Sequence, residues 1–556
     1  MSTRKDDLPW LSSYDSEVPH TLDYPEKPVF DLVKEHIDRT PERTALLFFG
    51  KKISYGELGK AIESFSYSLK SLGVKEGTKV ALALPNCPQY VIAYYAILSL
   101  GAVVVPLNPL NTEREMVQIV NDGEVTFVVA LNLLGERIQK VKAQSKIEQV
   151  IYTSLADYLP FPLNLLYPLK QKLSPGAKAA VTEGLNFVDH LKTVPADFKT
   201  TLDKPIDVKK DIAVLIYTSG TTGKPKGVML SNYALVVNAF HAKSWGDMGQ
   251  DDRFLTVLPI FHGFGMSVCL NSILTSGGAA ILLPRYEAEE LLKAVHKYKP
   301  TVFAGVPTMY IGLINHPNFK KYNLSSLRGC FVGAAALPHE VKKRFEELTG
   351  SRLMEGYGLT EAVTAKSANP YQGINKTGSI GLPFPDTIMK IVDAEDGQKE
   401  LPPGEIGEII LKSPDIMLGY YKNPEDTNLT IRDGWLFTGD LGWMDEEGYF
   451  YIVERKKDLI ITSGFNVYPN EVEDVLYSHP AVNEACVVGI PDSYRGEAVK
   501  AFIVLRPGQE VGPEELKAFC AEQLTPYKVP RTIEIRNELP KSAIGKILRK
   551  ELRGVG

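Results

Sequence analysis

Residues 217–228, YTSGTTGKPKGV, combine serine, threonine, glycine and lysine directly after an apolar segment at residues 212–216. The apolar segment has the composition of a buried strand, so the glycine-rich stretch is expected to be a loop at the edge of a sheet. Glycines let backbone N–H groups turn toward an anion, while hydroxyl and ammonium groups add donors and positive charge. The pattern therefore predicts a phosphate-binding loop.

This loop is not a Walker A motif, which ends in Gly-Lys-Ser/Thr and opens a helix. Here Gly223 and Lys224 are followed by Pro225, which has no N–H group and disfavours helical geometry at the residue before it. We expect a mobile clasp on the outer phosphates of ATP. A flexible Ser/Thr/Gly linker is the alternative, and it is disfavoured because such linkers rarely follow an apolar strand directly.

The composition of the whole chain is that of a globular protein with more than one domain. Its 556 residues are 44% hydrophobic and 23% charged, with a net charge of -5, and a chain of this length exceeds what one core usually organises. The absence of a basic excess argues against nucleic-acid binding. The 5 cysteines form no CxxC pair and the 9 histidines no metal-binding spacing, which predicts reduced thiols in a cytoplasmic protein without a zinc site.

Two segments raise the question of membranes. Residues 90–107 are long and uncharged enough to resemble a membrane span, but Gly101 and Pro106 divide them into an apolar helix and a valine-rich strand. Residues 158–175, YLPFPLNLLYPLKQKLSP, are rich in Leu, Tyr and Pro, and the prolines argue against a long regular helix. This segment is interpreted either as an insertion packed on its own domain, which is favoured, or as a surface loop for peripheral contact with a membrane or a partner.

The order of apolar segments predicts an α/β fold. From Thr44 onward, strand-like and helix-like segments alternate as in a doubly wound architecture with layered sheets; examples are strands at 79–84 and 126–130 and helices at 55–72 and 287–298. Beyond Lys457 the units become shorter and describe a small α+β module, with strands at 485–490, 500–505 and 532–535 and a helix at 514–524. We therefore expect a large domain at 1–456 and a small one at 457–556, separated near the charged run 454–458, which is otherwise read as a solvated face.

Further motifs follow the glycine-rich loop in a fixed order. They are LPIFHGFGM at 258–266, GAA at 333–335, EGYGLTE at 355–361, the block DGWLFTGDLGWMDEEGYFYIVERKK at 433–457, DLIITSGFNVYP at 458–469 and LPKSAIGKILR at 539–549. Small residues permit close approach of a flat base, Tyr357 offers a stacking face, and Glu361 is an oxygen ligand of the kind Mg²⁺ prefers. In isolation Glu361 and Lys546 would be read as ordinary solvated side chains, and their motif context reverses that reading.

Together these motifs resemble the adenylate-forming (AMP-binding) superfamily, and most closely its bacterial long-chain fatty acid–CoA ligases. The resemblance covers essentially the full chain and implies an enzyme that uses ATP, Mg²⁺ and coenzyme A. It assigns catalytic roles to Lys546, Thr218, Glu361 and His262, with Thr218 and Glu361 on the metal. The implied ATP and AMP site comprises Thr218, Ser219, Gly220, Thr221, Thr222, Gly223, Lys224, Gly333, Ala334, Ala335, Glu355, Gly356, Tyr357, Gly358, Thr360, Asp440, Ile452, Arg455 and Lys546.

The same resemblance places the other substrates and the moving part. The acyl pocket is expected to involve His262, Phe264, Met266, Val306, Gly333, Leu359 and Val363, which are mostly apolar or small and suit a hydrocarbon tail. Gly464 is expected to line the coenzyme A tunnel, and Lys457 to be the hinge of the small domain. Phe437 stands where a histidine is commoner in the family, a departure that bears on chain preference. Related synthetases are often dimeric, so a homodimer is a further implication.

The predicted reaction is attack of a medium- or long-chain fatty acid carboxylate on ATP, giving acyl-AMP and pyrophosphate, followed by transfer of the acyl group to coenzyme A. Three alternatives stay open at this point. The first is another enzyme of the same fold, such as an aryl-CoA ligase or a freestanding adenylating enzyme. A luciferase-like oxygenase is the second, because LPIFHGFGM is luciferase-like. An inactive nucleotide- or lipid-binding protein is the third, and the intact chemical residues disfavour it.

Overall fold

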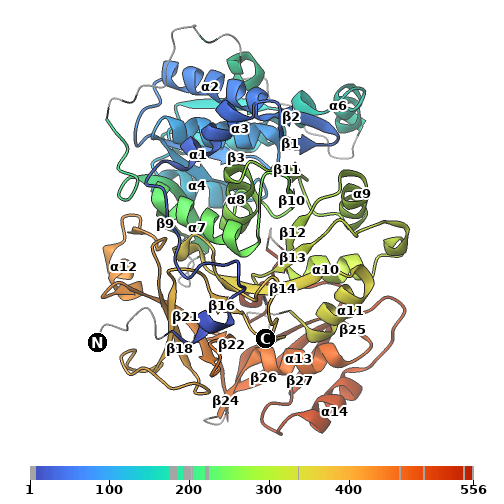
Figure 1. Cartoon of the computed structure of the whole chain (residues 1–556). Coiled ribbons are helices and arrows are strands. Elements are labelled where there is room, and N and C mark those ends of the chain that lie inside the picture. Colours follow the sequence, from blue (N-terminus) through green and yellow to red (C-terminus); the bar gives the residue numbers. More distant parts are fainter. Residues whose placement is uncertain are drawn as a thin grey trace.

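The computed structural model describes residues 8–173, 184–191, 194, 202, 204–219, 225–335, 337–462, 465–492, 495–542 and 545–553. Within these residues the strands form four sheets. The first and second sheets lie in the upper and middle parts of Figure 1, the third lies below them, and the fourth belongs to the C-terminal part at the bottom. The prediction of an α/β fold with layered sheets is confirmed.

The first sheet carries the glycine-rich hairpin. Its strand order is β19-β9-β8-β4-β3-β5-β6-β7, and all neighbours from β8 to β7 are parallel. The strands are β3 (Lys79–Ala83), β4 (Val103–Pro106), β5 (Phe127–Leu131), β6 (Gln149–Thr153), β7 (Leu185–Asn186), β8 (Ile212–Ser219), β9 (Pro225–Ser231) and β19 (Gly419–Tyr420). Helices α2 (Tyr55–Ser71), α3 (Pro88–Ser99), α4 (Glu113–Asp122) and α5 (Gly135–Ala143) connect and cover its strands.

Side-chain alternation along β3 separates two cores. Val80 and Leu82 belong to the large core shared with α2 and α3, whereas Ala81 and Ala83 face a second core built with α4 and α5, as the two-residue period of a strand requires. Helix α3 is buried along its whole length, because it lies in the helical layer between the first and second sheets. This explains why its sequence is apolar on every side.

The second sheet has the order β16-β15-β14-β13-β12-β10-β11-β1-β2. Its strands are β1 (Thr44–Phe48), β2 (Lys51–Ser54), β10 (Arg253–Thr256), β11 (Ala279–Leu282), β12 (Val302–Gly305), β13 (Gly329–Val332), β14 (Arg352–Gly358), β15 (Ala365–Ala368) and β16 (Leu382–Pro383). The accompanying helices are α1 (Val29–Arg39), α7 (Asn232–Trp245), α8 (Ser272–Thr275), α9 (Ala288–Tyr298), α10 (Pro307–Ile314) and α11 (His339–Thr349). Strands β12, β13 and β14 are parallel neighbours, so their carboxyl ends open at the same edge.

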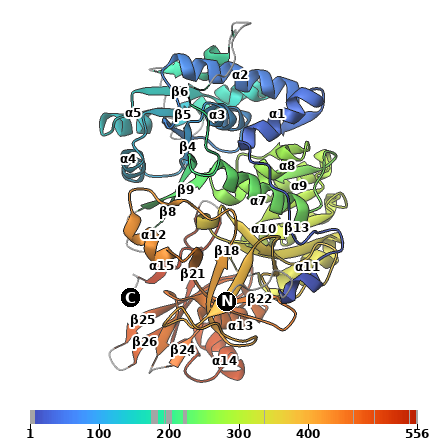
Figure 2. The same cartoon turned by 60° about the vertical axis from the view of Figure 1, so that its left-hand side comes forward.

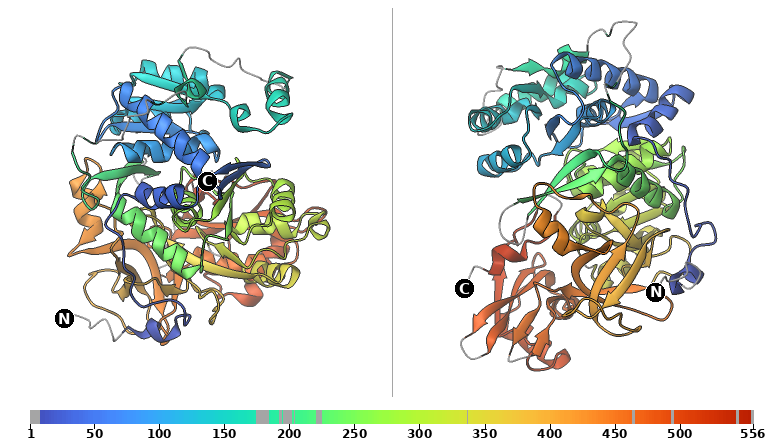
Figure 3. Two further views of the ribbon diagram at one scale, coloured as in Figure 1. Left: turned by 45° about the horizontal axis from the view of Figure 1, so that its top comes forward. Right: turned by 90° about the vertical axis from the view of Figure 1, so that its left-hand side faces the viewer.

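The third sheet contacts the N-terminal segment and directly precedes the C-terminal unit in the chain. It comprises β17 (Ile388–Val392), β18 (Gly407–Lys412), β20 (Ile431–Arg432), β21 (Trp435–Met444) and β22 (Phe450–Arg455), and α12 (Pro424–Thr430) lies beside β9 in Figure 2. An N-terminal strap before α1 runs along the large domain to this sheet (Figure 3). Its Trp10 ring meets the Phe450 ring edge-on at 5.9 Å.

The fourth sheet begins after β22 ends and forms the small C-terminal unit. It contains β23 (Ile460–Thr462), β24 (Phe465–Val467), β25 (Val482–Asp492), β26 (Gly496–Leu505) and β27 (Thr532–Arg536), packed with α13 (Pro469–Ser478), α14 (Pro513–Gln523) and α15 (Arg549–Arg553). The interval between β22 and β23 contains Lys457, the residue at which the sequence places the domain boundary. The hinge role of Lys457 remains a prediction.

The structure corrects the interpretation of residues 158–175. Helix α6 (Leu163–Leu173) forms here with Pro168 inside it, and Pro168 is exposed. Leu159 is buried, but large apolar side chains nearby are exposed: Phe161 by 80%, Leu165 by 66% and Leu169 by 55%. The segment is thus attached to its domain without being buried in it. No helix of the described residues is long and apolar enough to cross a membrane.

Candidate active site

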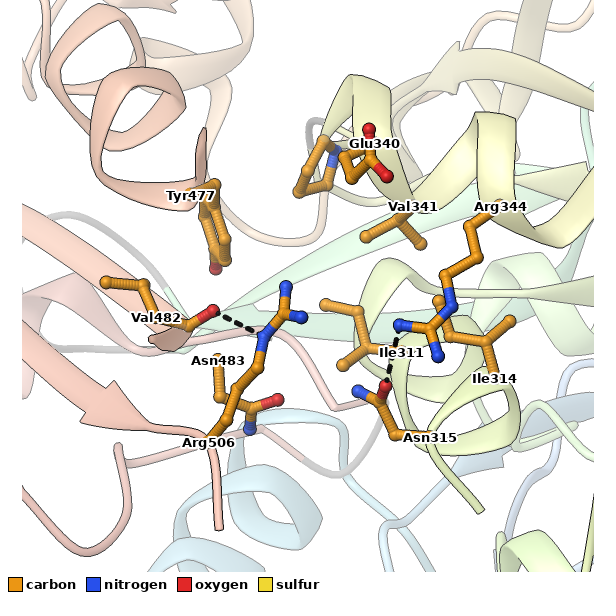
Figure 4. Close-up of a pocket in the computed structure, with 11 residues that line it drawn as sticks. Ile311, Ile314, Asn315, Glu340, Val341, Arg344, Tyr477, Val482, Asn483 and Arg506 are labelled. Atoms are coloured by element: carbon orange, nitrogen blue, oxygen red, sulfur yellow. Dashed lines mark hydrogen bonds between the residues drawn. The ribbon is translucent and has the colours of Figure 1, made fainter. Parts of the chain in front are cut away.

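A cavity of about 1200 Å³ lies between the large domain and the C-terminal unit, at the carboxyl ends of β8, β13 and β14. A second, much smaller pocket of about 50 Å³ lies elsewhere along the same interface, between α10, α11 and the C-terminal unit (Figure 4). Its apolar wall faces Arg344 and Arg506, whose polar atoms bond to neighbouring residues within their own domains. The small pocket has room for a few waters, so the large cavity is the candidate site.

Two paired strands flank the glycine-rich stretch, β8 before it and β9 after it. Strands β8 and β9 are antiparallel, with Thr218 opposite Lys226 and Ser219 opposite Pro225, so the loop feeds a strand and not a helix, as the proline indicates. Thr218 and Lys226 line the cavity, and the Lys226 ammonium is held 2.7 Å from Asp426 of α12. The predicted ligands Gly220, Thr221, Thr222, Gly223 and Lys224 lie outside the described residues, as does the side chain of Ser219.

The segment after β13 and the end of β14 form one wall of the cavity. All the predicted site residues there line it: Gly333, Ala334, Ala335, Glu355, Gly356, Tyr357, Gly358 and Thr360. A Cβ atom on Gly358 would lie 1.5 Å from the Thr364 carbonyl oxygen, so only glycine fits this close approach. Burial raises the pKa of Glu355 to about 8, which keeps its carboxyl mostly protonated at pH 7 and avoids a buried charge.

Opposite this wall, β21 and β22 bring an aspartate and an arginine together. Asp440 pairs in register with Arg455, and the Arg455 Nε atom lies 3.1 Å from the Asp440 carboxylate. The Tyr357 hydroxyl donates to the same carboxylate at 2.6 Å. Ile452 lines the cavity beside them. Asp440 therefore orients both the tyrosine ring and the guanidinium while presenting a carboxylate to the cavity.

Lys546 enters the cavity from the C-terminal unit. Burial, with the positive charge of Arg455, lowers the pKa of Lys546 to about 8. The segment is docked on α10, because the Thr308 hydroxyl donates to the Gly545 carbonyl at 3.1 Å. Burial and the neighbouring Lys546 charge lower the pKa of His262 to about 4, so the imidazole is neutral at pH 7. The structure thus brings together two residues that lie about half the chain length apart in the sequence.

Glu361 and Thr218, the predicted metal ligands, both line the cavity. The Tyr420 hydroxyl donates to one oxygen of the Glu361 carboxylate at 2.8 Å, which fixes the carboxylate while leaving the rest of its acceptor capacity available. A hydroxyl oxygen and one carboxylate are a donor set that fits Mg²⁺. No cluster of three or more His, Cys, Asp or Glu side chains suited to a metal occurs in the described part of the chain.

The apolar end of the cavity differs in part from the predicted acyl pocket. His262, Phe264, Val306, Gly333 and Leu359 line it, whereas Met266 and Val363 do not. Met266 does not line the cavity because residues Phe264–Asn271 form a π-helix. Its wider turn directs Phe264 and Val268 toward the cavity and Met266 into the core. Val363 is fully buried at a turn with φ of 61°, so its side chain is directed into the protein.

Sequence reasoning missed the residues that extend the apolar end. Ala242 and Trp245 in the last turn of α7 and Met248 just beyond it line the cavity, together with Val268, Ala368, Ile380 and Phe384. The Trp245 indole is fixed by an Nε1–H donation to the Asn369 carbonyl at 3.0 Å and packs on the Phe384 ring at 4.9 Å. No motif contains these residues, and only the apolar character of α7 and of the π-helix, η6 (Phe264–Asn271), indicates that they are buried.

A model of the AMP-binding enzyme family matches residues 33–421, and a model of the AMP-binding enzyme C-terminal domain matches residues 471–546. The chain belongs to the AMP-binding enzyme family. A long-chain-fatty-acid–CoA ligase of Bacillus subtilis (strain 168) is 46% identical over 547 residues, covering 98% of this chain and 97% of the relative. A feruloyl-CoA synthase of Amycolatopsis sp is 33% identical, and the match covers 92% of this chain and 96% of the relative.

Solved structures agree with this membership. The anthranilate CoA ligase AuaEII in complex with anthranoyl-AMP has a TM-score of 0.84 and 29% identity to this AMP-binding enzyme, over 99% of this chain and 98% of that chain. The likeness covers both domains. The predicted C-terminal domain beginning at residue 457 contains the whole span matched by the C-terminal model, and the span of the other model ends inside the predicted large domain.

Proposed function

We propose that this AMP-binding enzyme is a long-chain fatty acid–CoA ligase. The observation that carries the proposal is the shape of the large cavity, which runs from Lys546 and the phosphate hairpin to an apolar end walled by Trp245, Met248 and Phe384. A hydrocarbon tail entering this end exchanges water for apolar contacts, at roughly 0.8 kcal/mol per buried CH₂ group. The near full-length similarity to a long-chain-fatty-acid–CoA ligase supports the same substrate.

In the first half-reaction a carboxylate oxygen forms a bond to the α-phosphorus of ATP, and the bond to the bridging oxygen breaks to release pyrophosphate. Both reactants are anionic, so the transition state requires preorganised positive charge. Lys546 supplies it in the cavity, and Arg455 with Asp440 orients the nucleotide. His262 is neutral at pH 7, so it contributes hydrogen bonding and shape to the acyl site without a competing charge.

Thr218 and Glu361 would hold Mg²⁺ beside the phosphates. A bound Mg²⁺ ion neutralises developing charge on the phosphate oxygens. The residues of this chain fix the approach: the hairpin positions Thr218, and Tyr420 orients the Glu361 carboxylate. Glu361→Gln is expected to lower the affinity for Mg²⁺ measured by titration of the ATP complex, with little change in the affinity for the fatty acid.

In the second half-reaction the coenzyme A thiol loses its proton, sulfur bonds to the acyl carbon, and the bond from that carbon to AMP breaks. Lys546 occupies the cavity in the present arrangement, so we propose that rotation of the C-terminal unit about Lys457 withdraws it and admits the thiol. Gly464, the proposed tunnel residue, lies outside the described residues. Such hinges consist of one or a few residues that absorb a large change in φ and ψ.

The experiment that tests the proposal measures pyrophosphate release with ATP-Mg²⁺ and acids of increasing length, each with and without coenzyme A. Turnover that rises with alkyl length and requires coenzyme A supports a long-chain ligase. An aryl-CoA ligase is the second candidate, favoured by the similarity to a feruloyl-CoA synthase, and preference for an aromatic acid would select it.

We also propose that residues 158–175 contact a membrane surface peripherally. The exposed leucines of α6 form an apolar face, and the sequence between Asp157 and Glu183 contains lysines but no acidic residue, a combination that suits an anionic lipid surface. Flotation with vesicles of phosphatidylglycerol and phosphatidylcholine tests this. The double variant Leu165→Glu with Leu169→Glu is expected to abolish flotation and to leave octanoate activation unchanged. Flotation of the double variant equal to that of the parent would contradict the membrane assignment. A double variant that still floats but no longer forms dimers would also contradict it.

A further inference from the structure

Hydrogen bonds across the boundary at Lys457 converge on one short segment of the large domain. Asn470 donates from its backbone N–H to the Glu454 carboxylate at 3.3 Å and from its side chain to the Val453 carbonyl at 3.0 Å. The Arg549 guanidinium donates to the other Glu454 oxygen at 2.7 Å. Glu454 belongs to β22, whereas Asn470 and Arg549 belong to the C-terminal unit, so this cluster joins the two domains.

Arg549 also has partners inside its own domain. Its second terminal nitrogen bonds to the Asn470 side-chain oxygen at 2.6 Å and to the Glu473 carboxylate at 2.7 Å. The Glu454 side chain is only 2% exposed and that of Arg549 20%, so the ion pair between the domains is largely screened from water. Charged hydrogen bonds in such surroundings are short and strong.

The cluster of Glu454, Asn470 and Arg549 lies close in the sequence to both Lys546 and the proposed hinge, so it can affect the position of Lys546. Arg549 follows Lys546 by three residues in the segment that enters the cavity, and Glu454 precedes the proposed hinge by three residues. Fixing Arg549 against β22 therefore fixes the depth and direction from which the Lys546 ammonium enters. The Thr308–Gly545 hydrogen bond holds the other side of the same segment.

We propose that Glu454 is a positioning residue that holds Lys546 in the adenylate-forming arrangement through Arg549, and that this contact is broken when the C-terminal unit rotates for thioester formation. The inference rests on the proposed two-step function. Rotation about Lys457 leaves Glu454 with the large domain and carries Arg549, Asn470 and Glu473 away together. Arg549 keeps Glu473 throughout, so opening does not leave the guanidinium unpaired, and the contact can act reversibly.

A substitution at Glu454 separates this role from simple stabilisation. Glu454→Gln keeps the size and a hydrogen-bond acceptor but removes the charge that holds Arg549. Single-turnover formation of acyl-AMP is expected to slow about tenfold, while thioester formation from preformed acyl-AMP and coenzyme A stays within about twofold of the parent rate. Glu454→Asp, which keeps the charge, is expected to restore part of the first rate. A purely structural role would lower both half-reactions together.

Domain position provides a readout that is independent of chemistry. Glu454→Gln is expected to accelerate tryptic cleavage at Lys456 and Lys457, because the C-terminal unit spends more time away from β22. The matched control is Glu471→Gln, which removes an ion pair to Lys528 at 2.6 Å inside the C-terminal unit. This control is expected to change neither the ratio of the half-reactions nor the cleavage at the boundary.

The outcomes distinguish this inference from the proposed function. If the parent enzyme forms no acyl-AMP from any acid, the proposed function fails, and the proteolysis result still reports whether Glu454 holds the domains together. If the parent enzyme is active and Glu454→Gln slows both half-reactions equally, or slows neither, the positioning role is wrong. Unchanged cleavage at Lys456 and Lys457 in Glu454→Gln would also overturn it.

Discussion

The lowered pKa of Lys546 predicts that adenylate formation is lost as the pH rises, while the fold is intact. Burial lowers this pKa from its ordinary value of 10.5 to about 8, and only the protonated ammonium offsets charge in the first transition state. For a pKa near 8, about 90% of the free enzyme carries the charge at pH 7 and about 10% at pH 9. The kcat/KM value for ATP in acyl-AMP formation should therefore fall about tenfold between these pH values.

The assay follows single-turnover acyl-AMP formation without coenzyme A, so that the thiol does not titrate in the same experiment. The matched variant is Lys546→Arg, whose guanidinium stays charged throughout this range. The kcat/KM value of this variant is expected to be lower than that of the parent enzyme and independent of pH between pH 7 and pH 9. The kcat value of the parent enzyme should decline at a higher pH than kcat/KM, because bound phosphates raise the pKa of a neighbouring ammonium. A kcat/KM value that is level to pH 9, or an equal decline in Lys546→Arg, would refute the reasoning.

Four further substitutions test other parts of the site. Val268→Phe narrows the apolar end of the cavity and should shift the preferred acid to shorter chains. Met266→Leu replaces a core-facing side chain by one of similar volume and should leave the chain-length profile unchanged. The opposite pattern would show that the π-helix register is wrong. Lys457→Pro should spare adenylate formation and impair thioester formation in separate half-reaction assays, and equal loss of both would argue against a hinge there. Asp440→Asn removes the charge that orients Arg455 and Tyr357, so the KM for ATP should rise about tenfold or more, corresponding to roughly 1.4 kcal/mol, and an unchanged KM would show that Asp440 does not serve the nucleotide.

The nucleotide side of the site could be predicted from sequence because its chemistry demands particular residues at particular spacings. Gly358 has no room for a side chain, and Asp440 and Arg455 meet through the register of adjacent strands, so these positions leave recognisable motifs. In the C-terminal unit the sequence predicts β25, β26, β27 and α14, whereas β23, β24, α13 and α15 are not predicted from it. The observed bounds extend the predicted strands by a few residues, since pairing partners lengthen a strand beyond its most apolar part.

The acyl side could not be predicted equally well, because an apolar wall requires only fit and burial. Trp245 at the end of α7 and Met248 just beyond it reach the cavity through the packing of α7 against η6 and β15, which no local pattern encodes. The π-helix that turns Met266 away arises from tertiary packing and not from helix propensity. Helix α6 also departs from a local rule, because it contains Pro168 although proline disfavours helix interiors.

The most direct test of the central claim is pyrophosphate release by the purified enzyme with ATP-Mg²⁺ and acetate, octanoate, palmitate, oleate or 4-coumarate, with and without coenzyme A. A cavity with an apolar end beyond Lys546 predicts turnover that increases from acetate to the long-chain acids and depends on coenzyme A. Highest turnover with 4-coumarate, or release that is indifferent to both alkyl length and coenzyme A, would contradict assignment as a long-chain fatty acid–CoA ligase.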